Sequence, residues 1–204
     1  MKTKQLSTTS YAVLGLLALR PWTTYELAKQ MERSLHYFWP TAESMVYEEP
    51  KTLVTHGLAR AKEQYTGRRR STVYSITPKG RRALERWLTQ PGATPKFEFE
   101  AMLKVFFSDQ GTKEDLLAQL RSIEAWAADE LATRARIIAD YPRTGGPFPE
   151  RLHIIEIMVE FLQRNGRTIL EWSRWAQKRV AAWPDTRTAL ADPEIFLRLA
   201  KKDA

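Results

Sequence analysis

A short β-hairpin pattern among helical segments is the feature that most limits the folds open to this chain. Two runs rich in Thr, Val, Tyr and Ile flank the turn TGRRR at 66–70, which predicts a pair of antiparallel strands. Thr77-Pro78 then predicts a helix start, because Thr is a good N-cap and Pro suits the first helical position. Ser10 and Thr24 are the expected N-caps of the two earliest helices. Three helical patterns precede the hairpin, over about 10–19, 25–35 and 42–56.

The second half of the chain is predicted to be almost wholly helical. Pro, Gly and Thr cluster at 89–95, between helical patterns, and indicate a linker. We expect a mainly α protein with a small β-hairpin wing, divided into domains at 1–92 and 93–204. The helical patterns after the linker cover about 97–107, 112–141, 150–183 and a short terminal stretch near 193–201.

The charge is divided unevenly between these halves. The formal net charge is +8, and residues 1–95 carry 15 basic and 7 acidic side chains, whereas residues 96–204 carry 17 of each. An excess confined to one half indicates that this half meets a polyanion. The chain has no cysteine and no apolar run long enough for a membrane span, so we expect a cytoplasmic protein without a disulfide framework.

The order of three helices and a hairpin is that of a winged helix-turn-helix domain. In such a domain the second of the paired helices enters the DNA major groove, and the arginines of the wing can contact phosphates. The alternative is a solvated hairpin tip, which the charge asymmetry makes the less favoured interpretation. The residues expected to contact DNA are Tyr25, Thr41, Ser44, Tyr47, Glu48, Lys51, Arg68, Arg69, Arg70 and Ser71.

The third helical pattern has two distinct faces. Val46, Pro50, Leu53 and Gly57 share one stripe that is expected to face the domain core, and the opposite face is polar. Two acidic residues, Glu48-Glu49, oppose non-specific phosphate binding. A proline inside a helix removes one hydrogen bond. We expect either a bend near Pro50 or, as the competing outcome, a helix that begins there.

At these positions the sequence resembles the PadR family of bacterial transcriptional regulators. The matching segments are Leu14–Leu17, Pro21 with Tyr25–Leu27, Phe38-Trp39, Val46-Tyr47, Leu53, Gly57-Leu58, Val73–Thr77 and Gly80. This chain has Thr24 and Pro50 where the family often has Gly and Leu. The resemblance implies a homodimeric winged-helix DNA reader, most often a repressor, that is released by a small molecule or another signal.

The long pattern over 150–183 carries a broad apolar stripe. Packing against a second copy would cover it, which predicts an all-α dimerisation domain and a pseudo-palindromic operator. Asn165-Gly166 marks either a close helix crossing or a break. Trp172 and Trp175 could hold a flat aromatic effector, although packing is the interpretation we favour. The residues expected to form the dimer are Leu152, Ile155, Met158, Val159, Leu162 and Trp172.

The sequence gives no support for an enzyme or a metal protein. The three histidines His36, His56 and His153 lack metal-ligand spacing, and Gly145-Gly146 forms a turn without the Lys-Ser/Thr of a phosphate loop. We therefore expect no cofactor and no metal, and double-stranded DNA as the principal partner. The alternative of a different class is a protein-interaction or small-molecule-binding module that uses the winged helix without binding DNA.

Overall fold

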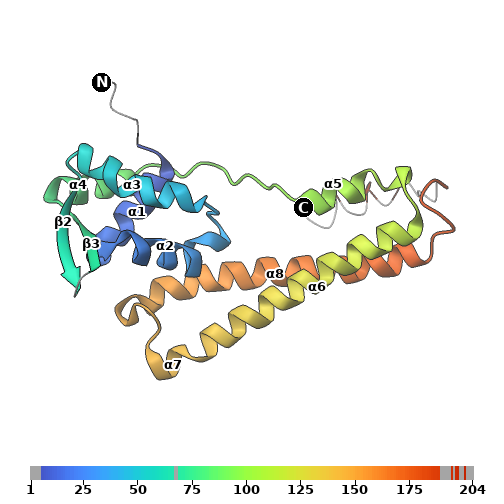
Figure 1. Ribbon diagram of the computed structural model, residues 1–204. Coiled ribbons are helices and arrows are strands. Elements are labelled where there is room, and N and C mark those ends of the chain that lie inside the picture. Colours follow the sequence, from blue (N-terminus) through green and yellow to red (C-terminus); the bar gives the residue numbers. More distant parts are fainter. Residues whose placement is uncertain (1–5, 67–68, 189–193, 195, 198–199, 201–204) are drawn as a thin grey trace. The chain divides into compact units, whose positions relative to one another are not determined.

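The computed structural model describes residues 6–66, 69–188, 194, 196, 197 and 200. The chain forms two compact units, Met1–Pro95 and Lys96–Ala204, which we call the N-terminal and C-terminal units (Figure 1). Arg68 and most of the helix expected near 193–201 lie outside the described residues.

Helices α1 and α2 begin at capping boxes that lie earlier than the sequence pattern suggested. Helix α1 (Thr8–Leu19) is capped by Ser7, and helix α2 (Thr24–Arg33) is capped by Thr23. The predictions of Ser10 and Thr24 as N-caps were wrong. In each box the third helical residue, Ser10 or Glu26, bonds back to the cap, and this reciprocal pair satisfies two backbone donors.

Helix α3 (Glu43–Thr55) follows a short 3₁₀ turn, η1 (Leu35–Tyr37), and runs continuously through Pro50. This excludes a helix that begins at Pro50, while the expected bend stays a prediction. Gly57 lies beyond the helix end with φ of +69°, and Gly57 and Leu58 donate backbone hydrogen bonds to Val54 and Leu53. Gly57 is exposed, so its placement in the core stripe was wrong; it terminates the helix in the left-handed conformation that favours glycine.

The hairpin belongs to a sheet of three strands. Strands β2 (Ala59–Thr66) and β3 (Arg69–Ile76) pair antiparallel, with Ala59 opposite Ile76 and Thr66 opposite Arg69. The two-residue strand β1 (Trp22–Thr23) pairs with the other side of β3. The sequence analysis missed β1, because two residues are too few to show the alternation that marks a strand.

Helix α4 (Pro78–Leu88) closes the N-terminal unit, and its cap is the predicted Thr77. Its Trp87 ring stacks on Tyr11 of α1 at a centroid distance of 5.0 Å. The deepest side chains of the unit come from α1, α2 and α3 together: Val13, Leu14, Leu17, Leu27 and Leu53. This shared core fixes α3 against α1 and leaves its opposite face exposed.

The C-terminal unit is built on two long helices. Helix α6 (Lys113–Ala139) and helix α8 (Leu152–Ala181) lie side by side in Figure 1, joined through α7 (Tyr141–Thr144) and η3 (Pro149–Arg151). Helix α5 (Glu100–Phe106) and the 3₁₀ turn η2 (Ser108–Gln110) precede them. The core of the unit is formed by Leu116, Leu120, Ile123, Ala176 and Val180.

Helix α8 is continuous through Asn165-Gly166, which confirms the close-crossing alternative. Gly166 is buried, and a Cβ atom there would stand 3.0 Å from Leu131 Cδ2 and 2.7 Å from an Arg134 nitrogen, both on α6. Glycine therefore allows the two backbones to approach at this position.

Candidate nucleic-acid interface

The two faces of α3 are arranged as the sequence predicts. Val46 and Leu53 are 3% and 0% exposed, and Pro50 is fully buried beside them. The opposite face carries exposed polar side chains and the half-buried Tyr47. Its exposed residues are Ser44, Glu48, Lys51 and Thr55. A helix fixed through one apolar stripe and presenting hydroxyl, carboxyl and ammonium groups on the other has the donors and acceptors that read base edges in a major groove.

An ion pair lies within this polar face. Lys51 Nζ donates to Glu48 Oε1 at 2.7 Å, and this hydrogen bond raises the pKa of Lys51. Exposed pairs of this kind are weak, because water screens the charges and both long side chains lose conformational freedom. Lys51 can therefore exchange its carboxylate partner for a phosphate or a base at little cost.

Glu49 faces the interior, so the prediction that it opposes phosphate binding was wrong. Its side chain is 0% exposed and accepts a hydrogen bond of 2.5 Å from Ser10 Oγ and one of 3.4 Å from Ser7 Oγ. Ser7 and Ser10 form the capping box of α1, so the carboxyl group lies at the N-terminal end of that helix. These hydrogen bonds join α3 to α1 across the core of the unit.

The described part of the β2–β3 hairpin carries one of the predicted basic side chains, that of Arg70. Arg70 is exposed and forms an ion pair with Glu63 of the neighbouring strand. Arg69 begins β3, opposite Thr66, and Ser71 is half-buried. Tyr65, which pairs with Arg70 in the register, is 67% exposed and was not among the predicted contacts. An aromatic residue close to the arginines in the sequence was the signal that could have identified it.

The remaining predicted contacts come from α2 and the segment before α3. Tyr25 is 59% exposed on α2, and Thr41 is half-buried two residues before the helix start. Together with Tyr47 these side chains surround a single hollow on the N-terminal unit. The structure thus gathers Tyr25, Thr41 and Tyr47, whereas the wing residues form a separate group on β2 and β3.

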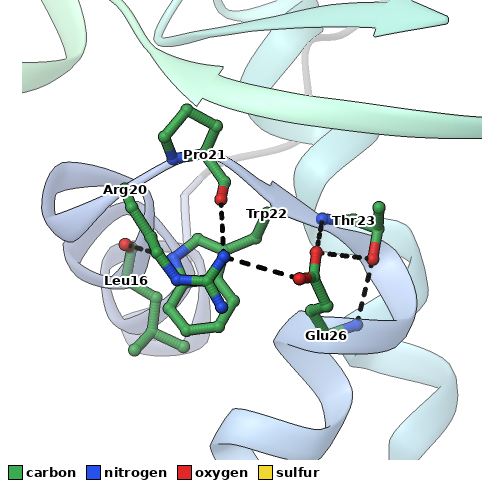
Figure 2. Close-up of polar contacts among 6 residues, drawn as sticks. All are labelled: Leu16, Arg20, Pro21, Trp22, Thr23 and Glu26. Atoms are coloured by element: carbon green, nitrogen blue, oxygen red, sulfur yellow. Dashed lines mark hydrogen bonds and ion pairs between the residues drawn. The ribbon is translucent and has the colours of Figure 1, made fainter. Parts of the chain in front are cut away.

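A set of polar contacts holds the start of α2 in place (Figure 2). The Arg20 guanidinium lies 3.5 Å from the centroid of the Trp22 ring, and Trp22 Nε1 donates to the Leu16 carbonyl at 2.7 Å. Arg20 also donates to Glu26 Oε1 at 3.4 Å, while Glu26 Oε2 accepts from the Thr23 backbone at 2.8 Å. The backbone hydrogen bond from Thr23 is the main reason why the pKa of Glu26 is lowered.

We expect Thr23→Ala to cost about 1 kcal/mol of stability, the usual loss of an N-cap.

The pKa of Glu26 in the folded state lies below its unfolded value of about 4.5. The Glu26 carboxylate therefore stabilises the folded state above that pH, and this stabilisation is lost as the pH falls through the lowered pKa. Urea unfolding of the wild type and of Glu26→Gln at pH 7 and pH 3 measures the stabilisation by the Glu26 carboxylate. The stability difference between the two proteins should shrink at pH 3, and a constant difference would contradict the expectation.

The predicted dimer residues divide between the core and the surface of the C-terminal unit. Leu162 is 6% exposed, and Trp172 packs against the α6–α8 core, because α6 covers that side of α8 within the same chain. Ile155, Met158 and Val159 are half-buried, and Leu152 is 37% exposed. Apart from Trp175, the most exposed apolar side chains of α8 are Ile154, Ile157 and Phe161, which the sequence analysis did not single out. Dimer formation through α8 stays a prediction.

The two tryptophans proposed for an effector do not share an environment. Trp172 lies against the core cluster, and Trp175 is 57% exposed three residues later on α8. Their role in ligand binding also stays a prediction. Among the described residues no group of three or more His, Cys, Asp or Glu side chains could hold a metal ion. None of the described helices has the length and apolar character needed to cross a membrane.

Comparison with known proteins matches both units. Residues 13–86 match the transcriptional regulator PadR-like family, and residues 99–181 match the virulence activator alpha C-terminal family. The negative transcriptional regulator PadR of Bacillus subtilis (strain 168) is 23% identical over 190 residues, which cover 90% of this chain and 97% of that protein.

Solved structures agree in fold. The Bacillus subtilis PadR structure in complex with operator DNA has a TM-score of 0.75 at 18% identity, covering 85% of this chain and 99% of that one. A second structure, of Bacillus subtilis PadR in complex with p-coumaric acid, has a TM-score of 0.67 at 17% identity, with 86% and 99% coverage. The winged-helix fold is therefore confirmed, and so is the resemblance to the PadR-like family of transcriptional regulators, whose model matches residues 13–86 of this chain.

Proposed function

We propose that this protein binds operator DNA as a homodimer and represses transcription until a small molecule releases it. The observation that carries the proposal is the polar, exposed face of α3, whose other face is buried in the core. Ser44, Tyr47 and Lys51 on that face are placed to enter a major groove, with the wing residues reaching the flanking phosphates. The net charge of +8 within residues 1–95 supports a polyanionic partner.

Regulation by a ligand follows from the same architecture. A ligand that binds the DNA-free state better than the DNA-bound state shifts the equilibrium by the difference between its two affinities. The relative from Bacillus subtilis has been solved both with operator DNA and with p-coumaric acid, which supports a small aromatic effector for this chain as well. We propose a non-enzymatic regulator that acts in the cytoplasm.

Footprinting of the full chain on the DNA upstream of its own gene tests the proposal, since regulators of this family commonly act near their own genes. A two-fold symmetric dimer should protect a pseudo-palindrome whose half-sites lie about one helical turn, or a multiple of it, apart. Absence of any protected region at moderate salt would favour the rival function, a winged helix that docks a protein instead of DNA.

A further inference from the structure

We propose that the carboxylates of Glu32, Glu48 and Glu63 suppress binding to non-operator DNA by neutralising the cations beside them. The inference rests on the proposed function and adds residues that separate operator from other DNA. The three carboxylates come from the three elements expected to face DNA: Glu32 from α2, Glu48 from α3 and Glu63 from strand β2 of the wing. Each of them forms an ion pair with a cation of the same element or of the neighbouring strand.

The two helical pairs each join residues three positions apart. On α2, Lys29 Nζ donates to Glu32 Oε2 at 3.1 Å. On α3, Lys51 Nζ donates to Glu48 Oε1 at 2.7 Å. The hydrogen bond that each lysine donates to its glutamate raises the pKa of that lysine, so both lysines are charged at neutral pH. Each pair of an ammonium group and a carboxylate therefore presents no net charge to DNA.

Lys29 is a DNA-facing cation that the sequence analysis missed. It follows Tyr25 by one helical turn, and residues four apart lie on the same face of a helix. Tyr25 is 59% exposed and is one of the expected DNA contacts. Lys29, Tyr25 and Tyr47 line the same hollow, so Lys29 lies next to the polar face of α3.

The third pair crosses the wing. Glu63 lies opposite Thr72 in the register, and Tyr65 lies opposite Arg70, so Glu63 and Arg70 are diagonal neighbours on one face of the hairpin. Their side chains form an ion pair in which 62% of Arg70 and 51% of Glu63 stay accessible. Glu63 thus holds a guanidinium group that is expected to contact phosphates, at a position that DNA can reach.

Paired cations contribute differently to loose and to close binding of DNA. A cation that neutralises a phosphate releases counterions condensed on the DNA, and this release drives non-specific binding. A cation that is balanced by a neighbouring carboxylate brings no net charge to the phosphate and releases fewer counterions. On the operator, the close fit of α3 in the groove brings phosphates into direct contact, and weak exposed pairs can open for them. The carboxylates therefore penalise random DNA more than the operator.

Replacing all three glutamates with glutamine tests the inference, because glutamine keeps the size of the side chain and removes its charge. At about 0.15 M salt, the full chain should bind a random duplex about tenfold to a hundredfold more tightly than the wild type does, since each freed cation adds about fivefold. The affinity for the protected operator should rise less, so that the ratio of operator to random-duplex affinity falls by about fivefold or more, the contribution of one cation. Fluorescence anisotropy on the two duplexes measures both affinities.

Two further variants separate this effect from other causes. The double variant of Glu32→Gln and Glu63→Gln keeps Glu48, so a base contact by Glu48 is retained, and its ratio should also fall. A triple variant with Glu85→Gln, Glu98→Gln and Glu150→Gln changes the net charge by the same amount at exposed positions outside α2, α3 and the wing. Because salt screens exposed charges, this control should bind the random duplex within about twofold of the wild type.

Three results would overturn the inference. The first is an equal gain in random-duplex affinity for both triple variants, which would make net charge alone responsible. The second is wild-type affinity of the Glu32, Glu48 and Glu63 variant for the random duplex, and the third is an unchanged ratio of operator to random-duplex affinity. A footprint of the wild type on its operator would still support the proposed function in each case, whereas a wild type without duplex affinity would overturn that function itself.

Discussion

Replacing Gly80 with alanine is expected to lower the free energy of unfolding of the N-terminal unit by about 3 kcal/mol or more, at the upper end of the cost of overpacking. Gly80 is buried in the first turn of α4, where a Cβ atom would press into the Leu58 carbonyl oxygen and stand 2.8 Å from Ile76 Cγ1. The Leu58 carbonyl accepts the backbone hydrogen bond of Thr77 at 2.9 Å. Because the obstacle is backbone, no side-chain rotation relieves it.

Gly15→Ala is the matched control. Gly15 lies inside α1, and an added Cβ atom would meet no atom within 4 Å. Alanine there should raise stability by up to about 1 kcal/mol, because glycine is the weaker helix former. Urea unfolding followed by tryptophan fluorescence compares both variants with the wild type. A Gly80→Ala midpoint equal to that of the wild type would mean that α4 does not pack on Leu58 as described.

Glu49→Ala is expected to cost about 2–4 kcal/mol, from the lost hydrogen bonds of a buried group and the space left by its side chain. Glu49 accepts from Ser10, which is itself 1% exposed, and this contact joins α3 to α1. Truncation should therefore also weaken operator binding, since α3 loses a fixed position relative to the rest of the unit. Glu49→Gln keeps a carbonyl oxygen and should retain most of the stability.

A double-mutant cycle with Ser10→Ala separates this contact from other effects of the substitution. If Ser10 and Glu49 interact as described, the double variant should cost less than the sum of the single variants by about 0.5–3 kcal/mol. Glu48→Ala, one residue earlier on the exposed face, is the control and should leave stability nearly unchanged. Additive costs for Ser10 and Glu49 would contradict the contact.

Local signals made most of the N-terminal fold predictable from the sequence. The hairpin, the Thr77-Pro78 helix start and the apolar stripe of Val46, Pro50 and Leu53 depend on periodicity and caps within a few residues. The starts of α1 and α2 were predicted a few residues too late. Ser10 and Thr24 are also good capping residues, and they lie close to the true caps Ser7 and Thr23. Strand β1 was missed because its only evidence is its pairing with β3, about fifty residues later in the chain.

The environment of single side chains was less predictable. Glu48 and Glu49 are adjacent and identical in type, yet one is exposed and the other is buried against Ser10, 39 positions earlier in the chain. In the same way, Leu162 belongs to the dimer stripe by periodicity but is already buried within its own chain. Sequence patterns identify an apolar stripe without identifying the surface that covers it. Which predicted contacts engage DNA stays a prediction.

The most direct test of the account is the salt dependence of duplex binding. Binding of the full chain to its protected upstream DNA can be followed by fluorescence anisotropy. The logarithm of the association constant should fall steeply with the logarithm of the salt concentration, and the magnitude of this slope should increase by about 0.9 for each phosphate contacted. Replacing Arg68, Arg69 and Arg70 together with alanine should weaken binding to all duplexes and flatten that slope by about 1–3, because up to three phosphate contacts are lost. An unchanged slope in this variant would contradict the wing assignment, and no duplex affinity of the wild type at moderate salt would contradict the central claim.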